Sequence, residues 1–552
     1  MNALTRFAAL PIAIGTLILT TPALQHMTAQ GQVTPRVYRF HGGGYDRAGA
    51  IAVDAAGDSY VAGSADAAKG KPTFAALRFA RQGHLIWRAN YSGSTGGLRG
   101  EGLAIAVDAQ GNVYTCGYVG VDMSSTETDA LVVKFDANGI EQWARRYNGS
   151  GNGPDAATGI LIDGAGNIYV SGYSYGSGLD WITFKYSPGG ALLWTRHHSG
   201  ARGNFDDRIS AAKFDPLGNL VLTGSTKNRG DSVTNDMTTL KYDSEGNVVW
   251  LRNYTETDVS HEQALSLAID AGGAVYISGD QTPTADPEGS APVPLTLAYD
   301  SAGNLLREIK QASPGTGMAI ALDQGGNLHL ATQSLLYTYD PSGNLVRSVP
   351  HIGNLAVADV LMDSQDNVLV AGSVFDPLTS ERDYYAAKFS PGGRQLWAHR
   401  FNGTGDRHDV VAGAALDHAG DLYVTGTSWS NYISLRGTAD DIVTLRFSGQ
   451  SNDTPPTAAP AAPGRLVART VSNTRITLSW TDNARNEAGF RIERCSGTGC
   501  TNFTQIAQVG AGVTGFSNSG LRRRTSYSYR VRAFNAGGDS GYSNTASATT
   551  PR

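Results

Sequence analysis

Short stretches in which apolar and polar residues alternate recur along most of this chain, and a glycine-containing turn separates each pair of them. AIAVDAQGNVYTCGY (104–118) and GILIDGAGNIYVSGY (159–173) are two examples. Alternation with a period of two on both sides of a tight turn predicts a β-hairpin. A second hairpin follows in each copy, with a third strand such as LVVKF (131–135) and a fourth that often contains Trp-x-Arg. The pattern therefore predicts four strands per copy.

An aspartate at the end of the first strand marks each copy of this pattern. Six of the seven spacings between markers are 52 to 55 residues and one is 40. The eight markers are Asp54, Asp108, Asp163, Asp215, Asp270, Asp323, Asp363 and Asp417. A four-stranded unit repeated many times predicts an all-β fold, an eight-bladed β-propeller in which each sheet packs on its neighbours around a common axis.

One copy also matches a known family. The segment LIDGAGNIYVSGYSYGSGLDWITFKYSPGGALLW (161–194) closely follows the recurring pattern of the bacterial SBBP-type propeller repeat. The chain resembles this family over about residues 36–449. The family name implies seven blades, so a seven-bladed propeller is the alternative to the eight blades that the markers predict. The copy after Asp323 departs most, because it lacks the third-strand lysine and nearly all of its middle loop.

The two ends of the repeat region complement each other. RVYRF (36–40) matches the outer strand of other copies, whereas the last copy ends after DIVTLRFSG (441–449) without an outer strand of its own. An unpaired edge strand is a liability in a β-protein. We therefore expect residues 36–40 to complete the last blade and so close the ring.

Residues 1–29 have the pattern of a secretory signal peptide. Arg6 precedes an apolar run from Phe7 to about Leu19, and small residues follow, which predicts cleavage near residue 23 or 29. A single membrane anchor is the competing interpretation, but the run is short and contains Pro11 and Gly15. We expect a secreted protein, extracellular or associated with the cell surface, with the periplasm as the alternative, and no integral membrane protein after cleavage.

The pattern changes after the repeats. Residues 450–464 are rich in proline and alanine and predict a semi-rigid linker. Residues 465–552 contain successive strands without the repeat turns and resemble a fibronectin type III domain. Trp480 stands at the position of the core tryptophan, and Leu521, Thr525 and Tyr527 match the Leu-x-Pro-x-Thr-x-Tyr corner, with Arg523 in place of the proline.

Carboxylates recur just before the first strand of most copies. They lie about eight positions before the marker, and they are Asp46, Glu101, Asp155, Asp207, Glu262 and Asp409. A ring of carboxylates at one mouth of a propeller could bind a ligand, with calcium as the candidate cation. The alternative, which the sequence favours, is that each acid accepts hydrogen bonds from the loop backbone of its own blade.

A second series of acids lies five residues before the third-strand Lys or Arg. Because an offset of five places two side chains on opposite faces of a strand, we expect these acids to bond between neighbouring blades. The series consists of Asp129, Asp180, Asp236, Asp383 and Asp441.

The three cysteines predict one disulfide. Cys495 and Cys500 enclose a glycine-containing turn and are expected to pair in an exported protein. Cys116 occupies a position that holds a small residue in other copies, so a buried, unreactive thiol is expected there.

Function is less well determined than fold. A net charge of −5 without a basic cluster gives no indication of nucleic-acid binding. We interpret the chain as an exported bacterial binding or surface-interaction protein, without catalytic residues or cofactor, whose partner is an extracellular protein or glycan. The alternative is an extracellular hydrolase or lyase that acts on polysaccharide. FDANGIEQW (135–143) resembles the tryptophan-docking motif of quinoprotein dehydrogenases, which leaves a redox enzyme as a remote third interpretation. Residues Arg229–Asp231 have the sequence Arg-Gly-Asp.

Overall fold

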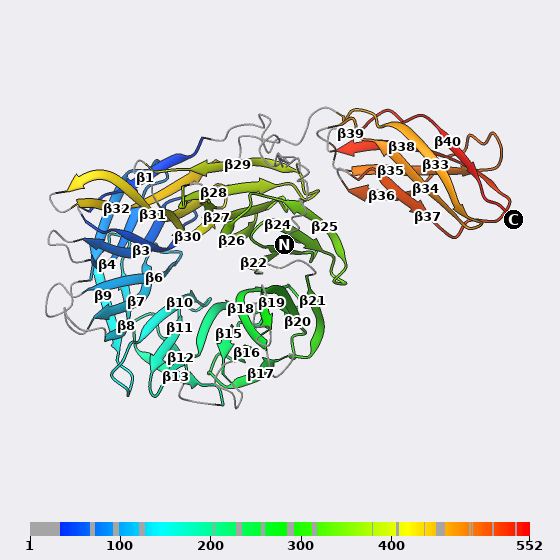
Figure 1. Ribbon diagram of the computed structural model, residues 1–552. Helices are drawn as coiled ribbons and strands as arrows, with labels where there is room; N and C mark the ends of the chain where they lie inside the picture. The colour runs from blue at the N-terminus through cyan, green and yellow to red at the C-terminus, as the bar shows by residue number, and fades with distance from the viewer. Residues whose placement is uncertain are drawn as a thin grey trace, which may run out of the picture.

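A computed structural model describes most of residues 34–552. The segments outside the description are residues 1–33, 43, 67–71, 92–98, 121–126, 202–204, 228–234, 256–259, 284–291, 312–315, 317, 378, 404–407, 435–436, 449–458, 485–486, 488, 511–512 and 536–537. The predicted signal peptide, most of the predicted linker and the Arg-Gly-Asp triplet lie in these segments. All regular elements of the described residues are β-strands (Figure 1).

The repeat region forms eight four-stranded antiparallel sheets from its described residues, here called sheets 1 to 8. Sheet 1 contains β2 (Arg47–Val53), β3 (Ser59–Asp66), β4 (Pro72–Phe79) and β5 (Leu85–Asn90). Sheet 2 contains β6 (Gly100–Val107), β7 (Val113–Gly120), β8 (Thr128–Phe135) and β9 (Glu141–Tyr147). Sheet 3 contains β10 (Ala156–Ile162), β11 (Ile168–Tyr175), β12 (Leu179–Tyr186) and β13 (Leu192–His198). Sheet 4 contains β14 (Arg208–Phe214), β15 (Leu220–Thr226), β16 (Asp236–Tyr242) and β17 (Val248–Tyr254).

The second half of the repeat region continues in the same way. Sheet 5 contains β18 (Ser260–Ile269), β19 (Val275–Pro283), β20 (Val293–Tyr299) and β21 (Leu305–Lys310). Sheet 6 contains β22 (Ala319–Leu322), β23 (Leu328–Ala331), β24 (Leu335–Tyr339) and β25 (Leu345–Pro350). Sheet 7 contains β26 (Leu355–Met362), β27 (Val368–Asp376), β28 (Glu381–Phe389) and β29 (Gln395–Phe401). Sheet 8 contains β30 (Asp409–Leu416), β31 (Leu422–Ser434), β32 (Gly437–Phe447) and, from the other end of the region, β1 (Arg36–Phe40).

The eight sheets follow one another around a common centre (Figure 1). The first strand of each sheet contacts the first strand of the next, and β30 of sheet 8 contacts β2 of sheet 1. Apolar clusters fill the space between adjacent sheets. One of them joins Tyr60 and Phe74 of sheet 1 to Leu131 and Phe135 of sheet 2.

The marker aspartates shape the first turn of each sheet. Asp54 Oδ1 accepts hydrogen bonds from the N–H groups of Ala56 and Asp58, both at 2.9 Å. Gly57 adopts a φ of +83°, which only glycine takes without strain. This geometry recurs in the other sheets, although in sheet 7 Asp366 takes the glycine position with a φ of +59°. The Asp-x-x-Gly spacing therefore recurs because the turn needs a hydrogen-bond acceptor at its first position and a positive φ at its fourth.

Four tryptophans of the outer strands, those of sheets 1 to 4, dock on the outer turn of the next sheet, whereas Trp397 of sheet 7 stacks on Phe447 of sheet 8. In sheet 2, Trp143 Nε1 donates to the carbonyl oxygen of Pro188 at 3.2 Å, and Arg145 Nε donates to that of Gly190 at 2.7 Å. A Cβ on Gly190 would lie 2.8 Å from the Trp143 ring, so this position must be glycine. The same contacts join sheet 3 to sheet 4 and sheet 4 to sheet 5.

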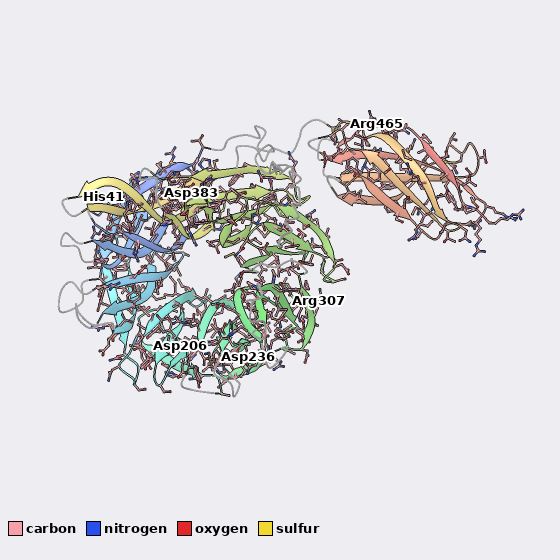
Figure 2. All side chains as sticks on the ribbon, in the orientation of Figure 1. His41, Asp206, Asp236, Arg307, Asp383 and Arg465 are labelled. Carbon is pink, nitrogen blue, oxygen red and sulfur yellow. A yellow bond between two sulfur atoms is a disulfide. The ribbon has the colours of Figure 1, made fainter. Side chains whose placement is uncertain are left out.

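Arginine replaces the docking tryptophan in sheets 5 and 6. Arg307 donates to the carbonyl oxygen of Pro341, and Arg347 donates to that of Pro391, each in the outer turn of the next sheet. Figure 2 labels Arg307 among the side chains of the sheets. A guanidinium can therefore replace an indole here, because both present an N–H donor at the end of a flat side chain.

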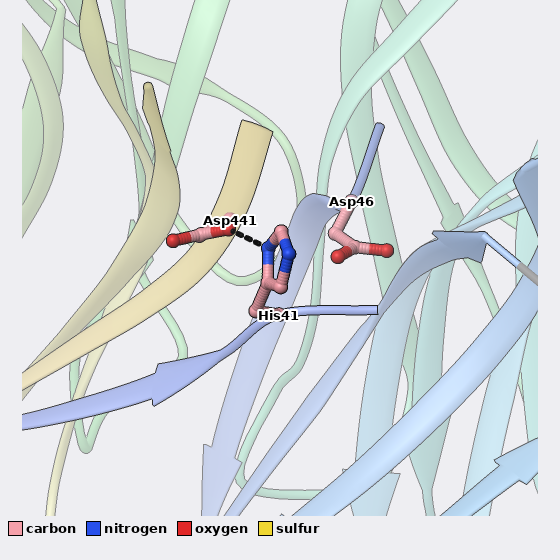
Figure 3. A group of neighbouring side chains, drawn as sticks. All are labelled: His41, Asp46 and Asp441. Atoms are coloured by element: carbon pink, nitrogen blue, oxygen red, sulfur yellow. Dashed lines mark hydrogen bonds and ion pairs between the residues drawn. The ribbon is translucent and has the colours of Figure 1, made fainter. Parts of the chain in front are cut away.

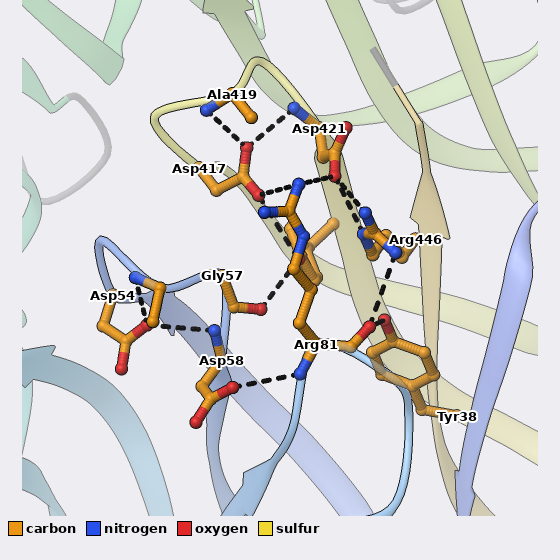
Figure 4. Close-up of polar contacts among 11 residues, drawn as sticks. Tyr38, Asp54, Gly57, Asp58, Arg81, Asp417, Ala419, Asp421 and Arg446 are labelled. Carbon is orange, nitrogen blue, oxygen red and sulfur yellow. Dashed lines mark hydrogen bonds and ion pairs between the residues drawn. The ribbon is translucent and has the colours of Figure 1, made fainter. Parts of the chain in front are cut away.

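The junction between sheet 8 and sheet 1 uses a tyrosine in the same position. β1 pairs antiparallel with β32, with Tyr38 opposite Thr444. The Tyr38 hydroxyl donates to the carbonyl oxygen of Arg81 at 2.7 Å, and its ring lies beside Gly83 of the outer turn of sheet 1 (Figure 4). Arg81 in turn forms an ion pair with Asp421 of sheet 8 at 2.7 Å. Sheet 8 thus contacts sheet 1 as the other sheets contact their successors.

Among the described residues, three acids of the second series form ion pairs within their own sheets, and not with a neighbouring sheet as we expected. Asp129 pairs with Arg146 of its own sheet at 2.7 Å, and Asp383 pairs with Arg400 of its own sheet. The reason is diagonal pairing. Arg146 lies opposite Leu131, two residues from Asp129 on the same face of the sheet. Two acids of this series, Asp236 and Asp383, are labelled in Figure 2.

The third-strand lysines, in contrast, connect two sheets. Lys241 Nζ lies 2.5 Å from Asp215 Oδ2 of its own sheet and donates to the carbonyl oxygen of Ser301 in the next sheet at 3.2 Å. Lys185 reaches the carbonyl oxygen of Ser244 in the same way, at 2.9 Å. The third-strand lysines therefore make the contact between neighbouring sheets that we had expected the second series of acids to make.

The C-terminal region forms a two-sheet sandwich. One sheet contains β33 (Gly464–Ser472), β34 (Arg475–Thr481) and β37 (Gly515–Asn518). The other contains β35 (Gly489–Ser496), β36 (Thr504–Gly510), β38 (Ser526–Asn535), β39 (Gly538–Asp539) and β40 (Ala546–Thr549). Trp480 and Leu521 are buried in the core between them, and the Tyr527 hydroxyl accepts a hydrogen bond from the Arg522 N–H at 2.9 Å.

Candidate functional site

The carboxylates that precede the first strands act as clamps on the loops that enter each sheet. Asp155 accepts hydrogen bonds from the N–H groups of Gly149 at 2.6 Å and Tyr175 at 2.9 Å. Asp207 accepts them from Gly200 at 2.6 Å and Lys227 at 2.8 Å. Each of these acids therefore ties the incoming loop to the end of the second strand of its own sheet.

Glycine is required at the other end of each clamp. A Cβ on Gly149 would lie 2.8 Å from Asp155 Oδ1 and 2.3 Å from the Ser174 hydroxyl oxygen. Asp409 and Asp46 repeat the arrangement with Gly403 and Gly42 as their donors. The joint occurrence of an Asn-Gly, Ser-Gly or His-Gly pair and a following acid is a sequence signal for this clamp.

Glutamate takes the acidic position in two sheets, with different contacts. Glu262 is buried, and its Oε1 accepts a hydrogen bond from Gln281 Nε2 at 3.3 Å. Glu101 is half-buried, and its Oε2 accepts a hydrogen bond from the Tyr118 hydroxyl at 2.9 Å. All six acids thus accept hydrogen bonds from their own sheet or from the loop that enters it. Calcium binding by these acids stays a prediction.

Asp46 lies beside two further metal-ligating groups at the junction of sheets 8 and 1 (Figure 3). One ligand atom each from His41, Asp46 and Asp441 lie within 4.8 Å of one another. His41 Nδ1 is 2.7 Å from Asp441 Oδ1, and Arg39 pairs with Asp441 Oδ2 at 2.8 Å. One histidine nitrogen and two carboxylates resemble a zinc donor set more than the six to eight oxygens that calcium takes.

We predict that zinc leaves the melting temperature of the protein unchanged. Both oxygens of Asp441 already have cationic or N–H partners, and the Gly42 N–H donates to Asp46, so a metal ion would have to displace these contacts. The measurement is a thermal unfolding curve with and without a tenfold excess of zinc. A rise in melting temperature that disappears in a His41→Ala variant would contradict this prediction.

Burial sets the protonation of the clamp acids. It raises the pKa of Asp207 to about 6, although the amides of Gly200 and Lys227 oppose the shift by donating to the carboxylate. It also raises the pKa of Asp155 and Asp409, for the same reason. The clamps therefore hold carboxylates that take up a proton more readily than free aspartate.

The raised pKa of Asp207 predicts a pH dependence. Its pKa is higher in the folded protein than in the unfolded chain, so the folded state binds the proton more tightly. The contribution of this group to stability is full below the unfolded value, near 4, and is lost as the pH rises through about 6.

The test is the difference in unfolding free energy between the wild type and an Asp207→Asn variant. We expect the wild type to gain stability relative to the variant as the pH falls from 7 to 5. A difference that does not change over this range would refute the assignment.

Exposed apolar residues form a recurring feature of the outer strands. Two of them directly precede the docking residue in sheets 1, 3, 4, 5 and 6, and their exposed fractions range from 41% to 59%. These pairs, here called the apolar rim, are Leu85 and Ile86, Leu192 and Leu193, Val248 and Val249, Leu305 and Leu306, and Leu345 and Val346. All lie at the turn end of the fourth strand, so they occupy the same end of each sheet.

The cysteines take the arrangement that their sequence context indicated. Cys495 and Cys500 form a disulfide, with Cα atoms 6.0 Å apart. Cys116 is fully buried, and burial raises the pKa of its thiol. A protonated thiol is a poor nucleophile, so Cys116 offers no reactive site.

Comparisons with known proteins identify two kinds of module in this chain. Residues 142–180 match the Beta-propeller repeat SBBP, and residues 461–549 match the Fibronectin type III domain. The chain therefore carries an SBBP propeller repeat and a C-terminal fibronectin type III domain. Proteins with such modules include many binding and cell-surface proteins, but neither module specifies an activity.

The individual relatives match only parts of the chain. The regulatory protein FlaEY of Caulobacter vibrioides is 29% identical over 174 residues, which is 28% of this chain and 18% of FlaEY. An alpha-amylase of Niallia circulans is 40% identical over 101 residues, 18% of this chain and 7% of the amylase. The structure of virginiamycin B lyase from Staphylococcus aureus covers 62% of this chain and 94% of its own, at 9% identity and a TM-score of 0.36. The chain thus spans less than a fifth of either sequence relative.

Among the described residues, no helix is of the length and apolar character that crossing a membrane would require.

Proposed function

We propose that this protein is an exported binding protein in which eight blades close into one propeller that presents the apolar rim to a partner protein. The fibronectin type III domain serves as a spacer or second contact module after the linker. The observation that carries the proposal is the apolar rim, because exposed apolar residues repeated at the same end of five sheets are typical of an interaction surface.

The blade number and the closure of the ring rest on the contacts between sheets. Eight sheets of described residues, the pairing of β1 with β32 and the contact of β30 with β2 support eight blades and a closed ring. Such a ring is a rigid platform, since every sheet is packed on both faces.

An extracellular polysaccharide hydrolase or lyase is the second candidate. The local similarities to an alpha-amylase and to Exoglucanase B of Cellulomonas fimi, 36% identical over 95 residues, favour it. These matches fit the fibronectin-like part of the chain, which accompanies the catalytic part of an enzyme and does not replace it.

The test uses fluorescently labelled protein from residue 30 onward and intact cells of the organism that encodes it. We expect saturable binding that protease treatment of the cells abolishes and that Leu192→Glu with Leu193→Glu weakens at least tenfold. Leu217→Glu is the matched control, since Leu217 is 85% exposed but lies in the first turn of sheet 4, outside the rim.

Two results would overturn the proposal. The first is binding that the rim variant and the control variant affect equally. The second is release of reducing ends from defined polysaccharides by the same protein, which would instead support the hydrolase or lyase.

A further inference from the structure

The two parts of this chain carry opposite charges. The fibronectin type III domain, residues 465–552, contains 12 arginines, no lysine and four acidic residues, which gives it a formal charge of +8. Residues 1–464 hold the remaining 32 basic and 45 acidic residues, a formal charge of −13. The net charge of −5 for the whole chain conceals this difference. A domain with so large an excess of positive charge attracts anionic partners.

The four acids of the domain leave one end of the sandwich to the arginines. Glu493 and Asp539 each form two ion pairs on the outer face of the larger sheet, at distances of 2.5 to 3.3 Å. Asp482 and Glu487 follow β34 at the end of the sandwich that adjoins the linker. The arginines that these ion pairs neutralise are Arg491, Arg530 and Arg532. The described residues at the opposite end have no acidic side chain among them.

Four exposed arginines lie at that opposite end, here called the basic end. Arg475 begins β34, and Arg522, Arg523 and Arg524 form the turn that precedes β38. The C-terminus marks this end of the domain in Figure 1, and Arg465 is labelled at the other end in Figure 2. Among the described residues, none of the four side chains forms an ion pair with a carboxylate. The basic end therefore presents four uncompensated charges to solvent.

Hydrogen bonds fix the backbone of the arginine turn. Leu521 and Tyr527 on either side of it are buried in the core, each 4% exposed. The Leu521 N–H donates to the carbonyl oxygen of Thr474 at 2.9 Å, which joins the turn to the residue before Arg475. The Arg522 N–H donates to the Tyr527 hydroxyl at 2.9 Å, and its carbonyl oxygen accepts from Thr550 Oγ1 at 2.6 Å. A fixed turn loses little backbone entropy when its side chains bind a ligand.

The fold does not require arginine in this turn. The Leu-x-Pro-x-Thr-x-Tyr corner that the chain resembles has proline where Arg523 stands, and it leaves the positions of Arg522 and Arg524 open. Arg524 adopts a φ of +52°, a conformation that asparagine and glycine take more readily than arginine. Three consecutive arginines at these positions therefore indicate a role outside folding.

The chemistry of the basic end fits an anionic chain without bases. Guanidinium groups bind carboxylate, sulfate and phosphate groups through pairs of parallel hydrogen bonds. Proteins that bind single-stranded nucleic acids also stack the bases on aromatic rings. The two turns of the basic end, residues 472–475 and 519–525, contain no aromatic residue. In an exported protein, which residues 1–29 predict, the anionic chain that meets these criteria is a polysaccharide.

We propose that the basic end binds an anionic polysaccharide, whose uronate carboxylates or sulfate esters pair with Arg475 and with the three arginines of the turn. The basic end does not adjoin the linker, so a bound polyanion avoids the acidic part of the chain that precedes the domain. This proposal shares with the proposed function only the expectation of export. It gives the fibronectin type III domain a ligand that does not depend on the apolar rim.

The experiment is isothermal titration of the protein, residues 30–552, with polygalacturonate and with dextran sulfate at about 0.15 M salt. Neutral dextran and duplex DNA are the ligand controls. We expect saturable binding of at least one charged polysaccharide, none of dextran, and weaker binding of DNA at the same concentration of anionic groups. The polysaccharide that binds more tightly distinguishes carboxylates from sulfate esters. The rim variant Leu192→Glu with Leu193→Glu should bind it as the wild type does, whatever its effect on binding to cells.

Two arginines with the same backbone conformation supply a matched pair of variants. Arg524 at the basic end and Arg465 at the other end are both exposed, and both have a φ of +52°. Asparagine tolerates this conformation, so Arg524→Asn and Arg465→Asn each remove one charge without adding strain. We expect Arg524→Asn to weaken polysaccharide binding about fivefold, the effect of one cation at an anionic surface, and Arg465→Asn to leave it unchanged.

A triple variant removes the whole turn cluster. Arg522→Ser, Arg523→Pro and Arg524→Asn together restore the proline of the corner and should weaken binding more than Arg524→Asn alone. Three results would overturn the proposal. They are the absence of binding to both charged polysaccharides, tighter binding of DNA than of either polysaccharide, and equal effects of Arg524→Asn and Arg465→Asn.

Discussion

Replacing Tyr38 by alanine should lower the free energy of unfolding by about 3–5 kcal/mol, the usual cost of removing a buried aromatic ring. The side chain is 1% exposed, packs with Phe79 of sheet 1 and Tyr423 of sheet 8, and donates to the carbonyl oxygen of Arg81. Its loss leaves a cavity at the junction where the first and last parts of the repeat region meet.

Urea unfolding measures this effect, with Val37→Ala as the control on the same strand. Val37 is 44% exposed, so its truncation should cost less than about 1 kcal/mol. Equal losses for the two variants would mean that β1 does not bury its side chains against sheets 8 and 1.

Replacing Lys388 by methionine should cost a similar amount, about 3–5 kcal/mol, because it leaves the buried Asp363 carboxylate without its cationic partner. The Lys388 side chain is 1% exposed, and its Nζ lies 2.9 Å from Asp363 Oδ2, which is also buried. Burial alone would raise the pKa of Asp363, but Asn367 and Lys388 outweigh it and hold the pKa below its ordinary value.

The control is Lys310→Met. Lys310 pairs with Glu308 at 3.0 Å, but both side chains are 33% exposed, and pairs of this kind contribute little. We expect a change within about 0.5 kcal/mol for this variant. A loss for Lys388→Met no larger than that of Lys310→Met would show that the buried pair does not stabilise the sheet.

Much of the architecture could be predicted because it depends on local patterns. The four-stranded copies follow from alternation and from the marker turns, in which Asp54 and Gly57 act within five residues of each other. Residues 36–40 were recognisable as an outer strand from their likeness to other copies. Sheet 6 keeps four strands although its sequence departs most, and His329 contacts the marker Asp323 there much as Tyr114 contacts Asp108 in sheet 2.

The remaining features depend on which side chains the fold brings together. Strand offset alone could not show that Arg146 lies diagonally opposite Asp129, because that depends on the register of the neighbouring strand. The clamp of Asp155 joins the loop that contains Gly149 to the end of β11 at Tyr175, so the role of this acid could be recognised only from the fold.

The pairing of β1 with β32 is the central claim of this account, and a disulfide tests it most directly. Val37 lies opposite Leu445, so cysteines at both positions fall within disulfide reach when Cys116 is replaced by alanine. A Val37→Cys, Val467→Cys protein is the unpaired control. If β1 pairs with β32, mild oxidation joins the peptides that contain positions 37 and 445 in the folded protein, as mass spectrometry would show. Free thiols at both positions after oxidation, as in the control, would contradict it.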